Sequence, residues 1–82
     1  MHNKVIDFPQ YRKLSNNKVF YRIVSNVVFE EIQIIGNKAL LHQIEAIQYP
    51  EMIRIKDMLE LNGYEMSTES EFLKLINDYS LC

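Results

Sequence analysis

The sequence is short of the residue types that build several kinds of functional site. Its 82 residues include one cysteine, two glycines, two prolines and no tryptophan. The single cysteine, Cys82, cannot form an internal disulfide or a zinc cluster. The two glycines are too far apart for a glycine-rich phosphate loop, and no Gly-x-Ser-x-Gly or His-Glu-x-x-His motif occurs. We therefore expect no metal site, no cofactor and no enzymatic activity.

Long apolar stretches are also missing. No run of about 18 apolar residues occurs, so the sequence predicts no membrane span. The first twenty residues lack the apolar core of about 7–15 residues that marks a signal peptide, so we expect a cytoplasmic protein. No linker or repeat divides the chain, which predicts one domain over residues 1–82. Residues 1–9 are expected to form an N-terminal arm.

The chain does not carry charge of one sign, but its charges are unevenly distributed. Residues 1–24 hold five basic side chains and one acidic side chain, a net charge of +4. Residues 25–82 hold four basic and ten acidic side chains, a net charge of −6. Such asymmetry is typical of a polyanion-binding face, or of charge complementarity within the domain. The overall net charge of −2 leads us to favour the second interpretation.

Residues 11–24 have the pattern of a β-hairpin. Asn16 and Asn17 tolerate the left-handed backbone of a tight turn, and β-branched and aromatic residues follow them. A turn at this point places Lys13 opposite Phe20 and Tyr11 opposite Arg22. Because side chains alternate along a strand, these four share one face of the hairpin. The other face carries Leu14, Val19, Tyr21 and Ile23.

The next segment, residues 25–38, fits two structures. As a helix, Val28, Phe29, Ile32 and Ile35 form one apolar stripe, and Gly36 suits its C-terminal end. As a strand, each face carries a glutamate, Glu30 on one and Glu31 on the other. The β-branched residues favour a strand only weakly. We predict a helix here and keep the strand as the alternative.

The remaining elements are easier to assign. Residues 38–47 alternate as a strand, residues 50–63 have a helical stripe that ends at Gly63, and residues 64–66 suit a short edge strand. Thr68 and Glu71 form a capping box before the final helix. The predicted order is therefore ββαβαβα. It indicates an α+β fold, with a mostly antiparallel sheet of three to four strands and helices packed on one side.

His42 and the nearby acids are candidates for a metal or acid–base site. On the helical interpretation Glu30 and Glu31 lie away from the apolar stripe, and Glu45 projects from the opposite face of the strand that carries His42. These side chains do not converge through local geometry. We therefore expect His42 to be a partly buried histidine with hydrogen-bonded ring nitrogens.

Two surfaces are candidates for binding. Tyr11, Lys13, Phe20 and Arg22 alternate aromatic and basic character, a mixture that single-stranded nucleic acids bind. The competing interpretations are that a helix covers the two rings, which we favour, or that the face contacts a protein.

The second candidate is the helix over residues 50–63. Besides its main stripe it carries apolar residues on other faces, which is more than a small domain can readily bury. An ordinary broad core helix fits the pattern equally well. The residues assigned to a possible interaction surface are Met52, Ile53, Met58 and Leu61. We expect a non-catalytic protein–protein interaction or homodimerising module. The alternative is a single-stranded nucleic-acid-binding protein that uses the hairpin face.

Overall fold

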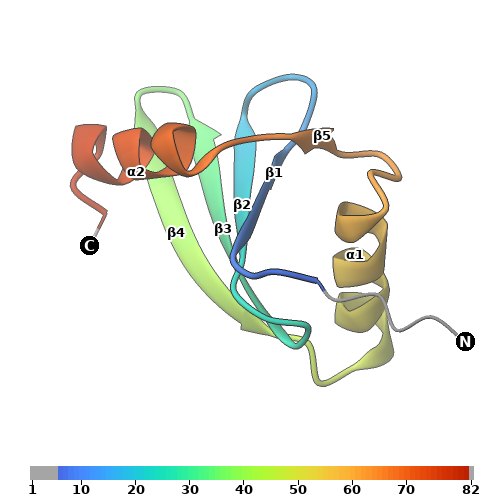
Figure 1. Cartoon of the computed structure of the whole chain (residues 1–82). Coiled ribbons are helices and arrows are strands. Elements are labelled where there is room, and N and C mark those ends of the chain that lie inside the picture. Colours follow the sequence, from blue (N-terminus) through green and yellow to red (C-terminus); the bar gives the residue numbers. More distant parts are fainter. Residues whose placement is uncertain (1–5, 82) are drawn as a thin grey trace, which may run out of the picture.

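The computed structural model describes residues 6–81 and contains an antiparallel sheet and two helices (Figure 1). Its strands are β1 (Gln10–Lys13), β2 (Val19–Ile23), β3 (Val28–Ile35), β4 (Lys38–Glu45) and β5 (Glu65–Met66), and its helices are α1 (Tyr49–Leu59) and α2 (Glu69–Asp78). The strands lie in the order β4-β3-β2-β1-β5. This arrangement confirms the α+β class, with five strands instead of three to four and the chain order ββββαβα.

The hairpin formed by β1 and β2 has the predicted register. Tyr11 pairs with Arg22 and Lys13 pairs with Phe20. At the turn, the amide of Leu14 donates to the carbonyl of Val19 at 3.0 Å, and Asn17 adopts a φ of 58°. Asparagine tolerates this left-handed backbone better than most residues, and this local preference made the register predictable.

The prediction of a helix over Phe29–Ile35 is wrong, because this segment is β3. β3 pairs with β2 through residues 29–33 and with β4 through all eight of its residues. Phe29 packs on one face of the sheet and Ile32 on the other, and both are fully buried. A strand buried on both faces loses the alternation of apolar and polar residues that identifies a half-exposed strand.

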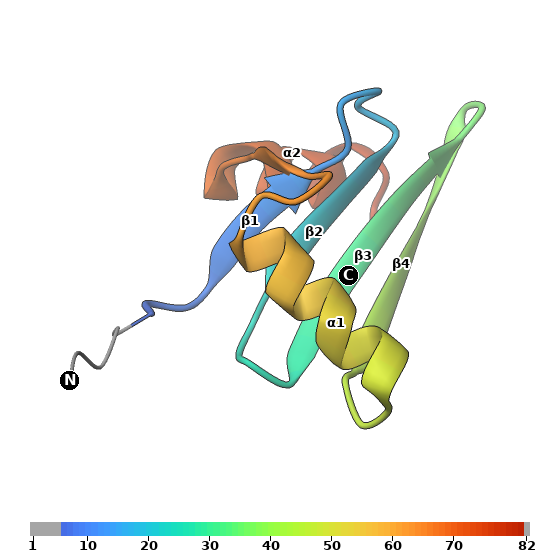
Figure 2. The ribbon, with the colours of Figure 1, turned by 90° about the vertical axis from the view of Figure 1, so that its right-hand side faces the viewer.

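The two helices pack on opposite faces of the sheet, which corrects the expectation that both lie on one side. In Figure 2, α1 crosses in front of the strands and α2 lies behind them. Ile55 and Met58 of α1 join the core on the face that carries Tyr21, Ile23 and Phe29. On the other face, α2 inserts Phe72 among three buried side chains, Tyr11, Phe20 and Ile32. The sheet is therefore the middle layer of three.

The helix boundaries follow the predicted signals. α1 has Pro50 in its first turn, where a missing backbone N–H costs least, and it ends shortly before Gly63. α2 is capped by Thr68, whose hydroxyl oxygen accepts a hydrogen bond from the Glu71 amide at 3.1 Å. The Glu71 carboxylate accepts a hydrogen bond from the Ser67 hydroxyl at 2.7 Å instead of from the Thr68 amide. Only one half of the predicted capping box is thus observed.

Residues 1–5 of the expected N-terminal arm lie outside the described residues. Within residues 6–9, Phe8 packs against the core cluster beneath α1, and the Asp7 carbonyl accepts a hydrogen bond from the Gln10 side chain at 3.1 Å. This part of the arm is therefore attached to the domain. Neither α1 nor α2 has the length and apolar character needed to span a bilayer.

Candidate functional site

The aromatic and basic face of the hairpin is covered by α2. Tyr11 and Phe20 are buried, and the Tyr11 ring lies 5.8 Å from the Phe72 ring. The Arg22 guanidinium lies 4.8 Å from the centre of the Phe72 ring. The two rings are thus occupied by the core, and in this structure they offer no platform on which bases could stack.

The two basic residues of this face are held in ion pairs. The Nζ atom of Lys13 lies 3.6 Å from a carboxylate oxygen of Glu71, and the Arg22 side chain donates a short hydrogen bond of 2.5 Å to Glu30. This bond raises the pKa of the Arg22 guanidinium. Both pairs join the basic N-terminal segment to the acidic remainder of the chain. They support the interpretation of the charge asymmetry as complementarity within the domain.

A second polar cluster, missed by the sequence analysis, lies on the face beneath α1. Arg54 of α1 donates to the buried Glu31 carboxylate of β3 at 2.8 Å, and its guanidinium lies 5.0 Å from the centre of the Phe29 ring. Tyr21 lies beside this pair, and the ring of Tyr64 meets the Tyr21 ring edge-on at 5.4 Å. Burial, reinforced by the charge of Glu31, raises the pKa of Tyr21. These groups satisfy one another, so the cluster attaches α1 to the sheet.

His42 lies on the strand neighbouring the acids. In the register of β3 and β4 it stands directly opposite Glu31, so these two side chains share a face of the sheet. This corrects the expectation that both Glu30 and Glu31 point away from the histidine, which depended on a helix at β3. Glu30 and Glu45 project from the other face. His42 is exposed rather than partly buried. Within residues 6–81, no three histidine, cysteine, aspartate or glutamate side chains are grouped closely enough to hold a metal ion.

Arg12 is a buried cation that the sequence analysis did not single out. Its side chain donates at 2.7 Å to the carbonyl of Met58, near the C-terminal end of α1, and at 2.7 Å to the carbonyl of Tyr11. Burial lowers the pKa of Arg12. Its charge complements the negative end of the helix dipole. The predicted hairpin register could have indicated that Arg12 is buried, because it places Arg12 opposite Tyr21, on the face that also carries Leu14 and Ile23.

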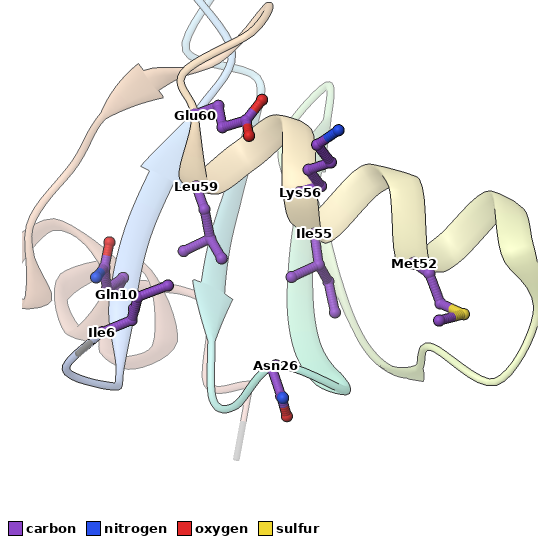
Figure 3. Close-up of a pocket in the computed structure, with 8 residues that line it drawn as sticks. All are labelled: Ile6, Gln10, Asn26, Met52, Ile55, Lys56, Leu59 and Glu60. Carbon is purple, nitrogen blue, oxygen red and sulfur yellow. The ribbon is translucent and has the colours of Figure 1, made fainter. Parts of the chain in front are cut away.

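A groove of about 540 Å³ runs beside α1 (Figure 3). Ile6, from the segment before β1, and Leu59, Ile55 and Met52, from α1, supply its apolar surface. Lys56 and Glu60 stand on the α1 side, and Gln10 and Asn26 contribute amides. A cation, a carboxylate and two amides around an apolar floor do not select one ligand chemistry. We assign the groove no ligand.

The four residues assigned to an interaction surface on the second predicted helix have different environments. Met52, Ile53 and Leu61 are exposed. The assignment of Met58 to an interaction surface is corrected, because Met58 is fully buried in the core between α1 and the sheet. Leu61 lies beyond the end of α1, in the turn towards β5. The exposed residues therefore do not form one helix face.

Exposed apolar residues also lie at both ends of β4. The part of this strand near the β3–β4 turn extends beyond α1 in Figure 2, while on the other face of the sheet Ala39 and Leu41 pack against the cluster that contains Phe72 of α2. Ile35 and Leu40 lie on the sheet face that carries α1 and are exposed beyond the end of the helix. Near the other end of β4, Ile47 and Tyr49 are 77% and 72% exposed. We call these four side chains, Ile35, Leu40, Ile47 and Tyr49, the β4 patch.

The geometry defines a three-layer α+β domain in which β4 is an edge strand with exposed apolar residues near both ends. Comparisons of the chain with models of protein families, with curated proteins and with solved structures found no match.

Proposed function

We propose that this domain is a protein-interaction module that binds through the β4 patch and has no catalytic role of its own. The observation that carries the proposal is the exposure of the patch. Its four large apolar side chains lie in two pairs along one edge of the sheet, and exposed apolar side chains gathered on one side of a small domain are typical of a protein-binding surface. A single cysteine suits a reducing compartment, and a cytoplasmic location is part of the same proposal.

The position of the polar side chains supports binding over catalysis. Glu31, Arg54 and Tyr21 are engaged with one another beneath α1. Lys13 and Arg22 are paired with carboxylates on the opposite face. The β4 patch, in contrast, presents apolar side chains to solvent, and burying such surface drives most protein association.

The test compares association of the full chain with that of a double variant, Ile47→Lys and Tyr49→Lys. Light scattering measures self-association, and surface plasmon resonance measures binding of any purified partner. We expect the double variant to weaken the association at least about tenfold, since two exposed apolar anchors commonly contribute 1 kcal/mol or more each.

The matched control is Leu73→Lys. Leu73 is an exposed apolar residue of α2, on the other face of the sheet, so this variant should associate like the wild type. The proposal fails if the wild type neither self-associates nor binds a protein saturably. It also fails if the double variant associates as tightly as the wild type.

A further inference from the structure

The outer edge of β4 is unusually open for a natural sheet. Its eight residues pair with β3 in an uninterrupted register, and the strand contains no proline and no glycine. No strand that the structure describes pairs with the outer side of β4. Natural edge strands are normally short, bulged, interrupted by proline or covered. β5, at the opposite edge, follows this rule, because it has two residues and leads at once into α2.

The outward amides of this edge can form a further ladder, although the Glu45 carbonyl at its end already accepts a hydrogen bond from the Ile47 amide at 2.9 Å. The Ala46 amide donates to the Val27 carbonyl across the β3–β4 pair at 2.7 Å. Because amides alternate in direction along an antiparallel strand, those of Ala39, Leu41, Gln43 and Glu45 point away from β3. β4 can therefore accept another antiparallel strand without any change in its own pairing.

We propose that the partner of this edge is a second copy of the same chain, which pairs antiparallel with β4 around a two-fold axis. The inference rests on the proposed function and names its partner. The two sheets of five strands join into one continuous sheet. A two-fold axis perpendicular to the sheet keeps both α1 helices on the same face.

The charges at the two ends of β4 are compatible with this antiparallel pairing. Lys38 begins the strand on the face that carries α1, and Glu45 ends it on the opposite face. Antiparallel pairing keeps the two copies of Lys38 at opposite ends of the interface, and likewise the two copies of Glu45. No like charges are therefore directly opposed, an arrangement that would destabilise a cross-strand contact.

The apolar residues of the β4 patch lie at both ends of the strand, where antiparallel pairing can bring them together. Ile35 and Leu40 lie near the start of β4, on a part of the sheet face that α1 leaves uncovered, while Ile47 and Tyr49 follow its end. Antiparallel pairing brings the start of one β4 beside the end of the other. Ile47 and Tyr49 of each copy then lie next to the uncovered Ile35 and Leu40 of its partner, twice in the dimer.

The size of the edge shows that these side chains must take part. An eight-residue strand is about 27 Å long, and with a sheet thickness of about 10 Å its edge covers roughly 270 Å² per copy. A stable interface buries about 1,200–2,000 Å² in total. The ladder alone is therefore too small, and removal of an apolar side chain of the patch should weaken the dimer strongly.

The first experiment measures the molar mass of the full chain by light scattering at concentrations up to about 1 mM, which detects dissociation constants well below that value. We expect a mass near twice 9.8 kDa. Gln43→Pro removes one outward amide and leaves the bonds to β3, and Leu40→Lys places a charge in the patch. Each should weaken the dimer at least about tenfold. Leu61→Lys is the matched control, since Leu61 is 45% exposed and Leu40 47%, and it should remain dimeric.

A second measurement does not depend on how these variants fold. A two-fold axis through an antiparallel pair places one residue opposite its own copy, and the middle of β4 is Leu41–His42. In a Cys82→Ser background, Leu41→Cys and His42→Cys are oxidised separately. Directly opposed Cα atoms about 4.5–5.5 Å apart fall within disulfide range, so one of the two variants should cross-link efficiently. Gln33→Cys, on the interior strand β3, should not.

The outcomes separate the two proposals. A wild-type monomer that binds another protein through the β4 patch overturns the dimer and leaves the proposed function standing. A dimer that is unaffected by Gln43→Pro and Leu40→Lys, and that cross-links at neither position, also overturns pairing through β4. A monomer that binds no protein overturns both. Loss of dimerisation in the two β4 variants, with cross-linking at the centre of the strand, supports both.

Discussion

Replacement of Phe72 by alanine tests the attachment of α2 to the sheet. Phe72 is fully buried, packs against Tyr11 at a ring separation of 5.8 Å and lies 4.8 Å from the Arg22 guanidinium. Truncation of a buried phenylalanine costs about 3–5 kcal/mol, from lost transfer energy and the cavity that remains. A domain of this length has a total stability of roughly 4–12 kcal/mol. The variant should therefore lose a large part of its stability.

Urea unfolding followed by circular dichroism measures this loss. With an m-value of about 2 kcal/mol/M, a loss of about 4 kcal/mol lowers the unfolding midpoint by roughly 2 M. The neighbouring Leu73→Ala is the control, because Leu73 is exposed and its truncation should change the free energy of unfolding by about 0.5 kcal/mol or less. A Phe72→Ala variant that loses less than about 1 kcal/mol at an unchanged m-value would refute the packing of α2 on the hairpin.

Two further predictions concern the polar cluster beneath α1. Arg54→Met leaves the buried Glu31 without its cation and should cost about 1–2 kcal/mol, less than a fully buried pair because the Arg54 side chain is 35% exposed. A double-mutant cycle with Glu31→Gln measures the coupling, and additive effects would contradict the contact. The pKa of Tyr21 is raised in the folded state, so the stability that its burial contributes is complete below the unfolded value of about 10 and is lost as the pH rises above it. Urea midpoints should therefore fall between about pH 9 and about pH 11, and less steeply in Tyr21→Phe; an equal fall in both proteins would show that Tyr21 is not responsible.

The elements that the sequence predicted correctly depend on short-range chemistry. The hairpin register follows from a turn at Asn16 and Asn17, and α2 begins where Thr68 caps the Glu71 amide. Each signal involves residues within a few positions of one another. The same local rules predicted the start of α1 at Pro50, one residue after its observed start at Tyr49, and identified the short strand β5.

The wrong prediction at β3 has a long-range cause. Glu30 and Glu31 gave each face of the supposed strand an acidic residue, which favoured a helix. In the structure Glu30 pairs with Arg22 of the adjacent strand and Glu31 with Arg54 of α1. Gly36, with a φ of 62°, begins a two-residue loop between equal strands. That loop was a hairpin signal present in the sequence.

The candidate sites were predictable only in part. The aromatic and basic residues of the hairpin lie on one face, as the alternation of side chains along a strand predicts. Nothing in their spacing indicates that Phe72 covers them. Likewise, the helical stripe does not reveal that Met58 is buried while Met52 is exposed. The pairing of Glu31 with His42 required the β3–β4 register, which the helical interpretation concealed.

The sequence by itself determined the hairpin, both helices, the charge asymmetry and the α+β class, because turns, caps and periodicity act over a few residues. Only the tertiary structure decided which faces are covered. The helices lie on opposite sides of the sheet, and α1 leaves one end of its face open beside β4. That outcome depends on which apolar surfaces meet across the whole chain. It leaves Leu40 and Ile35 in solvent, beside a strand edge that can still form hydrogen bonds.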